Sequence, residues 1–261
     1  MFETLQYAVI DQIAIITFDR PEAMNSFNKI MAHELKELTE QIKGDDSVRA
    51  VVLNGTGKLF MAGGDLRFFY DSLDMMPKGV LNLVRLLNAS VLNLMTMPKP
   101  VIASVHGSVA GAGISLMMAC DLVMAEEHTK FTLAYSGIGV SPDGGATYNL
   151  PRLVGAKKAM EWLLLSDVFD AKTAAAHGLI NWVMPADKMQ DEAMRIAKRL
   201  AMGPTQVFSR IKKLVRETWN TSLDAQLEEE GFAFEACTTT SDFRAGVTGF
   251  LHKKVPEFTG E

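Results

Sequence analysis

A glycine-rich stretch, His106–Asp121, carries residue types suited to binding a ligand through the backbone. It follows an apolar strand pattern at 100–105 and continues as an unbroken apolar run at 114–120, which predicts a strand, a tight turn and a buried helix. Its glycines are Gly107, Gly111 and Gly113. Glycine lets a backbone approach a ligand closely, and the first amides of a helix have no intrahelical partner. The turn could therefore hold a phosphate, a carboxylate or the oxygen of a reacting thioester.

Two alternatives apply to this turn. Its small residues could simply let helix and strand pack tightly. A dinucleotide-binding reductase is a weaker interpretation, because Leu116 stands where the third glycine of a GxGxxG pattern belongs. The sequence has no GxxxxGK[ST] loop either, so a P-loop is not expected.

Composition narrows the functional classes. The chain has 261 residues, of which 48% are hydrophobic, enough for a sizeable core. A formal net charge of −5 argues against a nucleic-acid partner. No uncharged apolar run reaches membrane-spanning length, and the N-terminus lacks a signal-peptide pattern, so we expect a cytoplasmic protein with no membrane partner. The two cysteines and five histidines form no metal-binding spacing, and no metal is expected.

The elements that must position this turn alternate along the chain. Apolar runs predict strands at 8–10, 13–18, 48–53, 100–105, 122–125, 131–134 and 179–184. Helical patterns lie between 26 and 44 and at 81–96, 150–165, 170–177, 188–202, 205–220, 222–238 and 241–254. We interpret 66–88 as a variable cover over a pocket. Ser141 and Pro142 suit the cap and first position of a further helix. The pattern predicts an α/β core over 1–200 and an α-helical region over 201–261.

Three ordered stretches resemble the crotonase superfamily, the enoyl-CoA hydratase/isomerase family. Phe60–Leu66 (FMAGGDL) resembles its A-G-x-D-[LI] loop, and Val105–Gly113 (VHGSVAGAG) resembles its G-x-x-x-G-[GA]-G turn. Gly139–Gly145 (GVSPDGG) is the third stretch, and Asp19–Asn25 (DRPEAMN) resembles the family's D-R-P-x-x-x-N opening. The order and spacing match over nearly the full chain.

The resemblance implies a crotonase-like spiral of ββα units, an α-helical C-terminal trimerisation region and a homotrimer or dimer of trimers. It implies an acyl-CoA substrate and no separate cofactor. It also implies that the backbone amides of Gly64 and Ala112 hold the thioester oxygen. Enolate chemistry needs such donors where negative charge develops, and losing one typically costs about 2.7–4 kcal/mol of barrier.

Substrate contacts carry over by position. Ala62, Asp65 and Leu66 match the part of the first loop that binds the adenine and pantetheine groups in the family, although Asp65 could equally be a turn or cap residue. Phe234 and Lys253 match tail positions that reach CoA, often from a neighbouring subunit; for Lys253 a solvated surface residue is the alternative.

Two positions depart from the hydratases of the family. Those enzymes activate water with two glutamates, where this chain has Ser115 and Tyr135. Neither is a carboxylate base, so hydration by that route is not expected. Tyr135 could hydrogen-bond substrate or form a pocket wall.

One acid matches a catalytic position of the family. Single-acid enoyl-CoA isomerases carry it where this chain has Asp143, and a lone carboxylate can move a proton between two carbons beside an oxyanion site. Asp143 could instead merely lie in the first turn of a helix, whose dipole would lower its pKa, whereas a dry pocket would raise it. Dehalogenase relatives pair such an aspartate with a histidine, but this chain has Asn88 thereabouts; naphthoyl-CoA synthase relatives leave ring closure open.

The sequence thus predicts a cofactor-independent enoyl-CoA isomerase that acts through an oxyanion-stabilised dienolate. Alternatives are an enoyl-CoA hydratase-like enzyme, another lyase of the family, or an acyl-CoA-binding relative with little catalysis. Further pocket or core candidates are Phe68, Phe69, Met75, Met76 and Leu92. His106 is expected to pack or cap rather than to catalyse.

Overall fold

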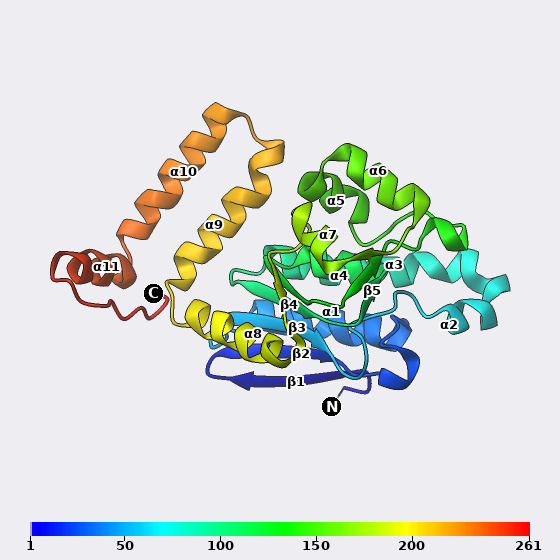
Figure 1. The fold of residues 1–261 in the computed structure, drawn as a ribbon. Helices are drawn as coiled ribbons and strands as arrows, with labels where there is room; N and C mark the ends of the chain where they lie inside the picture. The colour runs from blue at the N-terminus through cyan, green and yellow to red at the C-terminus, as the bar shows by residue number, and fades with distance from the viewer. Residues whose placement is uncertain (1) are drawn as a thin grey trace.

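The computed structural model describes residues 2–261, without the side chains of residues 75–78. The predicted pocket roles of Met75 and Met76 therefore lie outside the described residues. The mixed α/β architecture predicted from the sequence is present, with a helical region at the C-terminal end (Figure 1).

A six-stranded sheet forms the centre of the molecule. Its order is β1-β2-β3-β4-β6-β9, with β1 antiparallel to β2 and the other neighbours parallel. The strands are β1 (Leu5–Ile10), β2 (Ile13–Phe18), β3 (Ala50–Gly55), β4 (Val101–Val105), β6 (Leu122–Glu126) and β9 (Trp182–Met184). The β1–β2 hairpin turns at Asp11 and Gln12, where the sequence predicted it, and both residues have positive φ. Parallel order brings the carboxyl ends of β3, β4 and β6 to one edge, where ligands gather in such sheets.

The register explains how both faces of this sheet are covered. Ile13 pairs with Ala50 and packs on α8 (Ala186–Ala201) through Ala197. The next pair, Ala14 and Val51, points into the larger core on the opposite face. Because side chains alternate along a strand, two apolar clusters form on the two sides of one sheet.

A smaller three-stranded sheet lies beside the first. Its order is β5-β7-β8, formed by β5 (Ser108–Ala110), β7 (Lys130–Thr132) and β8 (Phe169–Asp170). β5 pairs in parallel with β7, which pairs antiparallel with β8. This sheet carries the turn that leads into α4 (Ala112–Ala119). All eight residues of α4 are buried, as its continuous apolar pattern predicted.

The remaining helices cover the sheets and form the tail. They are α1 (Lys29–Lys43), α2 (Leu66–Asp71), α3 (Met76–Thr96), α5 (Ala146–Val154), α6 (Ala156–Leu165), α7 (Ala171–Ala176), α9 (Thr205–Glu217), α10 (Leu223–Thr238) and α11 (Ser241–Leu251). Short 3-10 turns lie at 21–23, 73–75, 136–138 and 218–220. The Asn28 side chain caps α1 by accepting from the Met31 amide at 2.9 Å, and Gly44 follows its last residue.

α9 and α10 run side by side as an antiparallel pair, and α11 lies at the end of the pair where α9 begins (Figure 1). Ion pairs join α9 to the core: Lys212 Nζ lies 2.8 Å and Arg216 Nη2 lies 2.9 Å from the Asp121 carboxylate. The Arg49 side chain donates to the Gly203 carbonyl oxygen at 2.6 Å. The base of the tail is thus tied to the sheet.

Some predicted boundaries are wrong. The helix predicted at 150–165 is two helices, α5 and α6, separated at Gly155, whose φ of 81° and ψ of 154° break the helical path. The helix predicted to begin near Pro142 begins at Ala146, because Gly144 and Gly145 have positive φ. The cover predicted at 66–88 consists of α2, a 3-10 turn and the first half of α3.

α3 is the described helix that is long and apolar enough, by length and composition, to cross a membrane, within 79–96. The stretch contains Arg85, and Leu83, Leu87 and Leu94 are buried in the main core. A core helix passes the same test, so this property carries no membrane assignment.

Candidate active site

Two glycine-rich turns meet at the edge of the sheet. The Ala110 amide donates to the Met61 carbonyl oxygen at 2.9 Å, and the Met61 amide donates to the Ser108 carbonyl oxygen at 3.2 Å. The turns are separated by more than 40 residues in sequence, yet this short parallel bridge fixes one against the other.

Glycine is required where the turns touch. A Cβ on Gly63 would lie 3.2 Å from the Ala110 carbonyl oxygen, and φ there is +98°. Gly111, with φ of +47°, faces the Cα of Gly63. A Cβ on Gly113 would lie 2.9 Å from the Cβ of Met61. The glycines of both motifs therefore serve the close approach of two backbones.

This arrangement leaves two backbone amides without a partner. Phe27 bonds on either side of Gly64, donating to Gly63 O at 2.7 Å and accepting from Asp65 N at 3.0 Å. Ala112 is the first residue of α4, and the Ile114 and Ser115 amides both reach Gly111 O, at 3.0 and 3.3 Å. Within residues 2–261, no acceptor is recorded for the Gly64 or Ala112 amide. Two donors are thus available to one ligand oxygen.

Both amides border a cavity of about 600 Å³, a size typical of small-molecule sites. One wall comes from α3, where Val80, Leu83, Val84 and Leu87 form an apolar surface and Asn88 adds one side-chain amide. Across the described lining residues, the titratable side chains are those of Tyr135 and Asp143. No cluster of three His, Cys, Asp or Glu side chains suited to a metal occurs in the described part of the chain.

Asp143 reaches this cavity from a turn that needs glycine. Gly144 has φ of +57°, and a Cβ there would lie 2.7 Å from the Cβ of Ser115 in α4. The Ser115 hydroxyl donates to the Asp143 carbonyl oxygen at 3.1 Å. The turn therefore lies directly on α4, pinned by the small side chain that stands where hydratases would carry a glutamate.

Tyr135 holds the carboxylate itself. Its phenol donates to Asp143 Oδ1 at 2.9 Å, and its oxygen lies 3.1 Å from Ser115 Oγ. Burial raises the pKa of Asp143, and the hydrogen bond from Tyr135 opposes that rise. Burial, together with the Asp143 charge, raises the pKa of the Tyr135 phenol, which stays protonated at neutral pH.

One interpretation of Asp143 is wrong. The residue does not lie in the first turn of a helix, because α5 begins at Ala146 and the Ala146 amide instead closes a turn onto the Asp143 carbonyl oxygen at 3.0 Å. The lowering of the Asp143 pKa that a helix N-terminus would cause is therefore not the main effect. Desolvation is the largest effect, and it raises that pKa.

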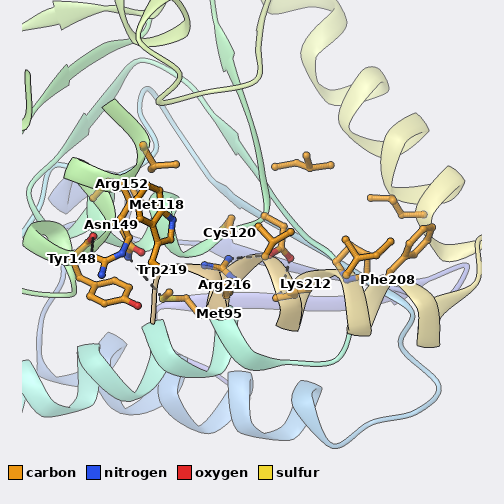
Figure 2. Close-up of a pocket in the computed structure, with 17 residues that line it drawn as sticks. Met95, Met118, Cys120, Tyr148, Asn149, Arg152, Phe208, Lys212, Arg216 and Trp219 are labelled. Atoms are coloured by element: carbon orange, nitrogen blue, oxygen red, sulfur yellow. Dashed lines mark hydrogen bonds and ion pairs between the residues drawn. The ribbon is translucent and has the colours of Figure 1, made fainter. Parts of the chain in front are cut away.

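A second pocket, of about 520 Å³, lies between α9 and the core (Figure 2). Its acid, Asp121, is engaged by Lys212 and Arg216. Burial raises the pKa of the Cys120 thiol there to about 12, so that thiol is no nucleophile at neutral pH. The catalytic candidates lie in the other cavity.

Comparison with known proteins agrees with this geometry. The family model described as enoyl-CoA hydratase/isomerase matches residues 9–261. A 1,2-epoxyphenylacetyl-CoA isomerase of Escherichia coli (strain K12) is 36% identical over 262 residues, covering 100% of both chains. A crotonyl-CoA hydratase of Syntrophomonas wolfei is 34% identical over 95% of each chain. The chain belongs to the enoyl-CoA hydratase/isomerase family.

Solved structures of this family share the fold. A crystal structure of an enoyl-CoA hydratase from Polaromonas sp. JS666 superposes with a TM-score of 0.93 at 31% identity, covering 97% of this chain and 99% of that one. The predicted membership of the crotonase superfamily and the crotonase-like fold class are thereby confirmed. The similar proteins carry both isomerase and hydratase names, so family membership alone leaves the reaction open.

The structure separates the other predicted site residues. Ala62 and Leu66 line the cavity, together with Gly64 and Ala112. Asp65 is not among the lining residues: it caps α2 by accepting from the Phe68 amide at 3.1 Å, and it pairs with Arg20 Nη1 at 3.1 Å. The turn or cap role left open for Asp65 is thus the one observed.

Phe234 and Lys253 lie on the projecting tail and are exposed, and neither lines the cavity within a single chain. Among the further candidates, Phe69 lines the cavity and Phe68 packs on the core. Leu92 was placed wrongly, because it is 59% exposed and is neither core nor cavity lining. His106 packs as expected, with Nε2 3.1 Å from the Gly57 carbonyl oxygen.

The apolar wall of the cavity was missed. Val80, Leu83, Val84 and Leu87 recur at i, i+3, i+4 and i+7, which is the signature of one helical face. The sequence contained that signal, but starting the helix at 81 and treating 66–88 as an irregular cover concealed it.

Proposed function

We propose that this protein is an enoyl-CoA isomerase that shifts a carbon–carbon double bond without a separate cofactor. The observation that carries the proposal is a single carboxylate, Asp143, in a cavity that two unpartnered amides also border. The relatives support an acyl-CoA substrate, and the 1,2-epoxyphenylacetyl-CoA isomerase supports isomerase chemistry.

In the proposed mechanism, the Gly64 and Ala112 amides donate to the thioester oxygen of a 3-enoyl-CoA. The Asp143 carboxylate removes a proton from the carbon next to the thioester. The electron pair of that C–H bond delocalises into a dienolate, whose negative oxygen the two amides stabilise. The protonated acid then returns the proton at carbon 4, which gives the conjugated 2-enoyl-CoA.

Hydration is disfavoured by the same site. Family hydratases use two glutamates to activate water, and here both positions carry hydroxyls that already bond to Asp143. Because the pKa of the Tyr135 phenol is raised, it is a poor base at neutral pH. A site with one carboxylate, Asp143, suits proton transfer between carbons better than water activation.

A second candidate is isomerisation of an epoxide carried on an aromatic acyl-CoA. The full-length similarity to 1,2-epoxyphenylacetyl-CoA isomerase favours it, as does the apolar wall of α3. The same amide pair would hold the thioester oxygen of that substrate.

An acyl-CoA panel in deuterated water, followed by mass spectrometry, separates these functions. The proposal predicts conjugation of 3-enoyl-CoA without added oxygen, whereas a hydratase would add one water to 2-enoyl-CoA. Turnover of the epoxide alone would favour the second candidate. Tight binding with neither turnover nor deuterium uptake would favour a catalytically weak acyl-CoA-binding relative.

We also propose assembly as a homotrimer or dimer of trimers, with Phe234 and Lys253 reaching the CoA of a neighbouring subunit. Support comes from large exposed apolar side chains on the tail, among them Trp219, Phe232, Phe234 and Phe250. We expect sedimentation velocity to detect a trimer or hexamer, and a monomer at micromolar concentration would contradict this proposal. We further propose a cytoplasmic location, which cell fractionation tests.

A further inference from the structure

Two hydroxyl groups surround Asp143, and they come from separate elements. Ser115 lies in α4 and is fully buried, whereas Tyr135 precedes the 3-10 turn at 136–138 and is 7% exposed. Both reach the same aspartate: Ser115 at the backbone carbonyl oxygen and Tyr135 at the carboxylate. The hydroxyls also lie 3.1 Å from one another, so the three residues form a closed network with both hydroxyls buried and Asp143 partly buried.

Counting protons restricts how this network is arranged. Three contacts are recorded, but only two hydroxyl protons are present to serve them. Oδ1 of an ionised Asp143 can only accept, so the contact to it must use the Tyr135 proton. The Ser115 proton is then shared between the Tyr135 oxygen and the Asp143 carbonyl oxygen. When the Ser115 proton points to the Tyr135 oxygen it holds the phenol, and when it points to the Asp143 carbonyl oxygen it holds the turn that carries the acid.

The second carboxylate oxygen of Asp143, Oδ2, differs from Oδ1 in its hydrogen bonding. Among residues 2–261, no other residue donates a hydrogen bond to Asp143 Oδ2. We propose that Tyr135, held by Ser115, is a positioning residue that fixes Oδ1 and thereby makes Oδ2 the atom that carries the proton. This rests on the proposed isomerase function, which needs one base to serve two carbons.

The phenol fits both states of the acid during turnover. When the C–H bond breaks, its electron pair passes toward the thioester oxygen and the proton forms an O–H bond at Oδ2. Oδ1 is then a carbonyl oxygen and still accepts from Tyr135. The acid need not rotate before Oδ2 returns its proton at the second carbon, so part of the abstracted hydrogen should appear in the product.

No other titratable side chain among the described residues that line the cavity competes with Tyr135 for Asp143. α4 contributes Ser115, which does not titrate, and α3 contributes Leu87 and Val91 beside Gly144 and Gly145. Of the described residues that line the cavity, Tyr135 is the one titratable partner of Asp143. Its hydrogen bond lowers the pKa of Asp143 against the effect of burial, so its removal should raise that pKa.

Tyr135→Phe tests the proposal, because it removes the hydroxyl and keeps the ring. We expect kcat to fall about 10- to 100-fold, the worth of a hydrogen bond to a charged group, with little change in KM. The acid limb of the kcat/KM profile should move to higher pH, and transfer of deuterium from carbon 2 to carbon 4 should decrease. Ser115→Ala should act in the same direction with a smaller effect.

Tyr7→Phe is the matched control, since Tyr7 lies on β1 outside the cavity lining. It should leave rate, pH profile and deuterium transfer unchanged. Circular dichroism and thermal melting of each variant verify folding.

A direct titration separates this inference from the proposed function. The carbon-13 signal of the Asp143 carboxyl, assigned by its loss in Asp143→Asn, is followed against pH in wild type and Tyr135→Phe. A higher pKa in Tyr135→Phe supports the positioning role, even if wild type converts no enoyl-CoA and the proposed function fails. An unchanged pKa with an unchanged rate overturns the positioning role, even if wild type is an active isomerase.

Discussion

Asp143 is the residue at which the account is most specific. Burial favours its neutral form, and the phenol of Tyr135 counters by stabilising the carboxylate, so the two effects oppose one another at one side chain. A base that must accept a proton and return it benefits from such opposition, because the raised pKa makes the carboxylate a stronger base while the phenol stabilises its charged form.

The raised pKa makes a prediction about stability. A group whose pKa is raised by folding contributes stability that is fully present below its unfolded pKa and is lost as pH rises through its folded pKa. At neutral pH the ionised Asp143 therefore costs stability. We expect Asp143→Asn to raise the Tm at pH 7 by a few degrees, and calorimetry should show the gain shrinking as pH approaches the ordinary aspartate pKa. A lower Tm at pH 7, or a gain that does not vary with pH, would count against the assigned environment.

Sequence reasoning reached the acid and the two amide positions through the motifs that carry them, but it could not reach the contacts among side chains. Tyr135 lines the cavity, as one of its two expected roles required, but the hydrogen bond from its hydroxyl to Asp143 was not expected. That contact joins residues eight positions apart through the 3-10 turn at 136–138, which ends at Gly139 with a φ of 73°.

At the scale of elements, the strands of the large sheet were predictable because buried parallel strands read as continuous apolar runs. Their ends were less so, since β1 begins three residues before the predicted start, and the short strands β5 and β8 were not predicted. Helix starts were also less predictable. Pro142 was expected to open a helix, but consecutive glycines with left-handed backbone delay it to Ala146. Because α5 begins only at Ala146, Asp143 lies in an irregular turn that packs on α4 and reaches the cavity from there.

Gly144→Ala tests this contact between turn and helix. Alanine would meet the Ser115 Cβ at 2.7 Å in a left-handed backbone, so the turn must shift and displace Asp143. We expect kcat to fall at least about 10-fold, since a small misplacement of a catalytic group is costly.

Gly139→Ala is the control, because φ there is also positive, at 73°, but no atom lies within 4 Å of the added Cβ. It should cost about 1 kcal/mol of stability, as expected for a non-glycine residue at positive φ, with little effect on kcat. Equal losses of activity in the two variants would mean that the contact with Ser115 does not matter.

For the whole molecule, a largely buried cluster of charges helps to anchor the tail. Burial lowers the pKa of Lys212, and the carboxylate of Asp121 opposes that shift. The Lys212 side chain is 8% exposed and Asp121 is 20% exposed, so solvent screens the cluster only in part. Two cations share this one acid, which makes the acid the sensitive member.

Asp121→Asn should therefore destabilise the protein by about 2–4 kcal/mol, because it leaves cations in a largely buried place without their partner. Urea unfolding measures the loss, and limited proteolysis should cut the tail sooner. Glu40→Gln, which breaks the exposed pair with Lys36, should cost less than about 1 kcal/mol. Similar costs for both variants would contradict the anchoring role of Asp121.

At this scale the sequence also showed its limit. The helical character of the C-terminal region was predictable from the sequence. The position of Phe234 and Lys253 relative to a ligand was not, because both lie outside the cavity of their own chain.

The most direct measurement is the rate of conversion of a 3-enoyl-CoA to its conjugated isomer by wild type and by Asp143→Asn, recorded side by side. The account predicts turnover by wild type and a loss of about 100-fold or more in the folded variant, the usual contribution of a general base. An undiminished rate in the variant, or no conversion by wild type, would contradict it.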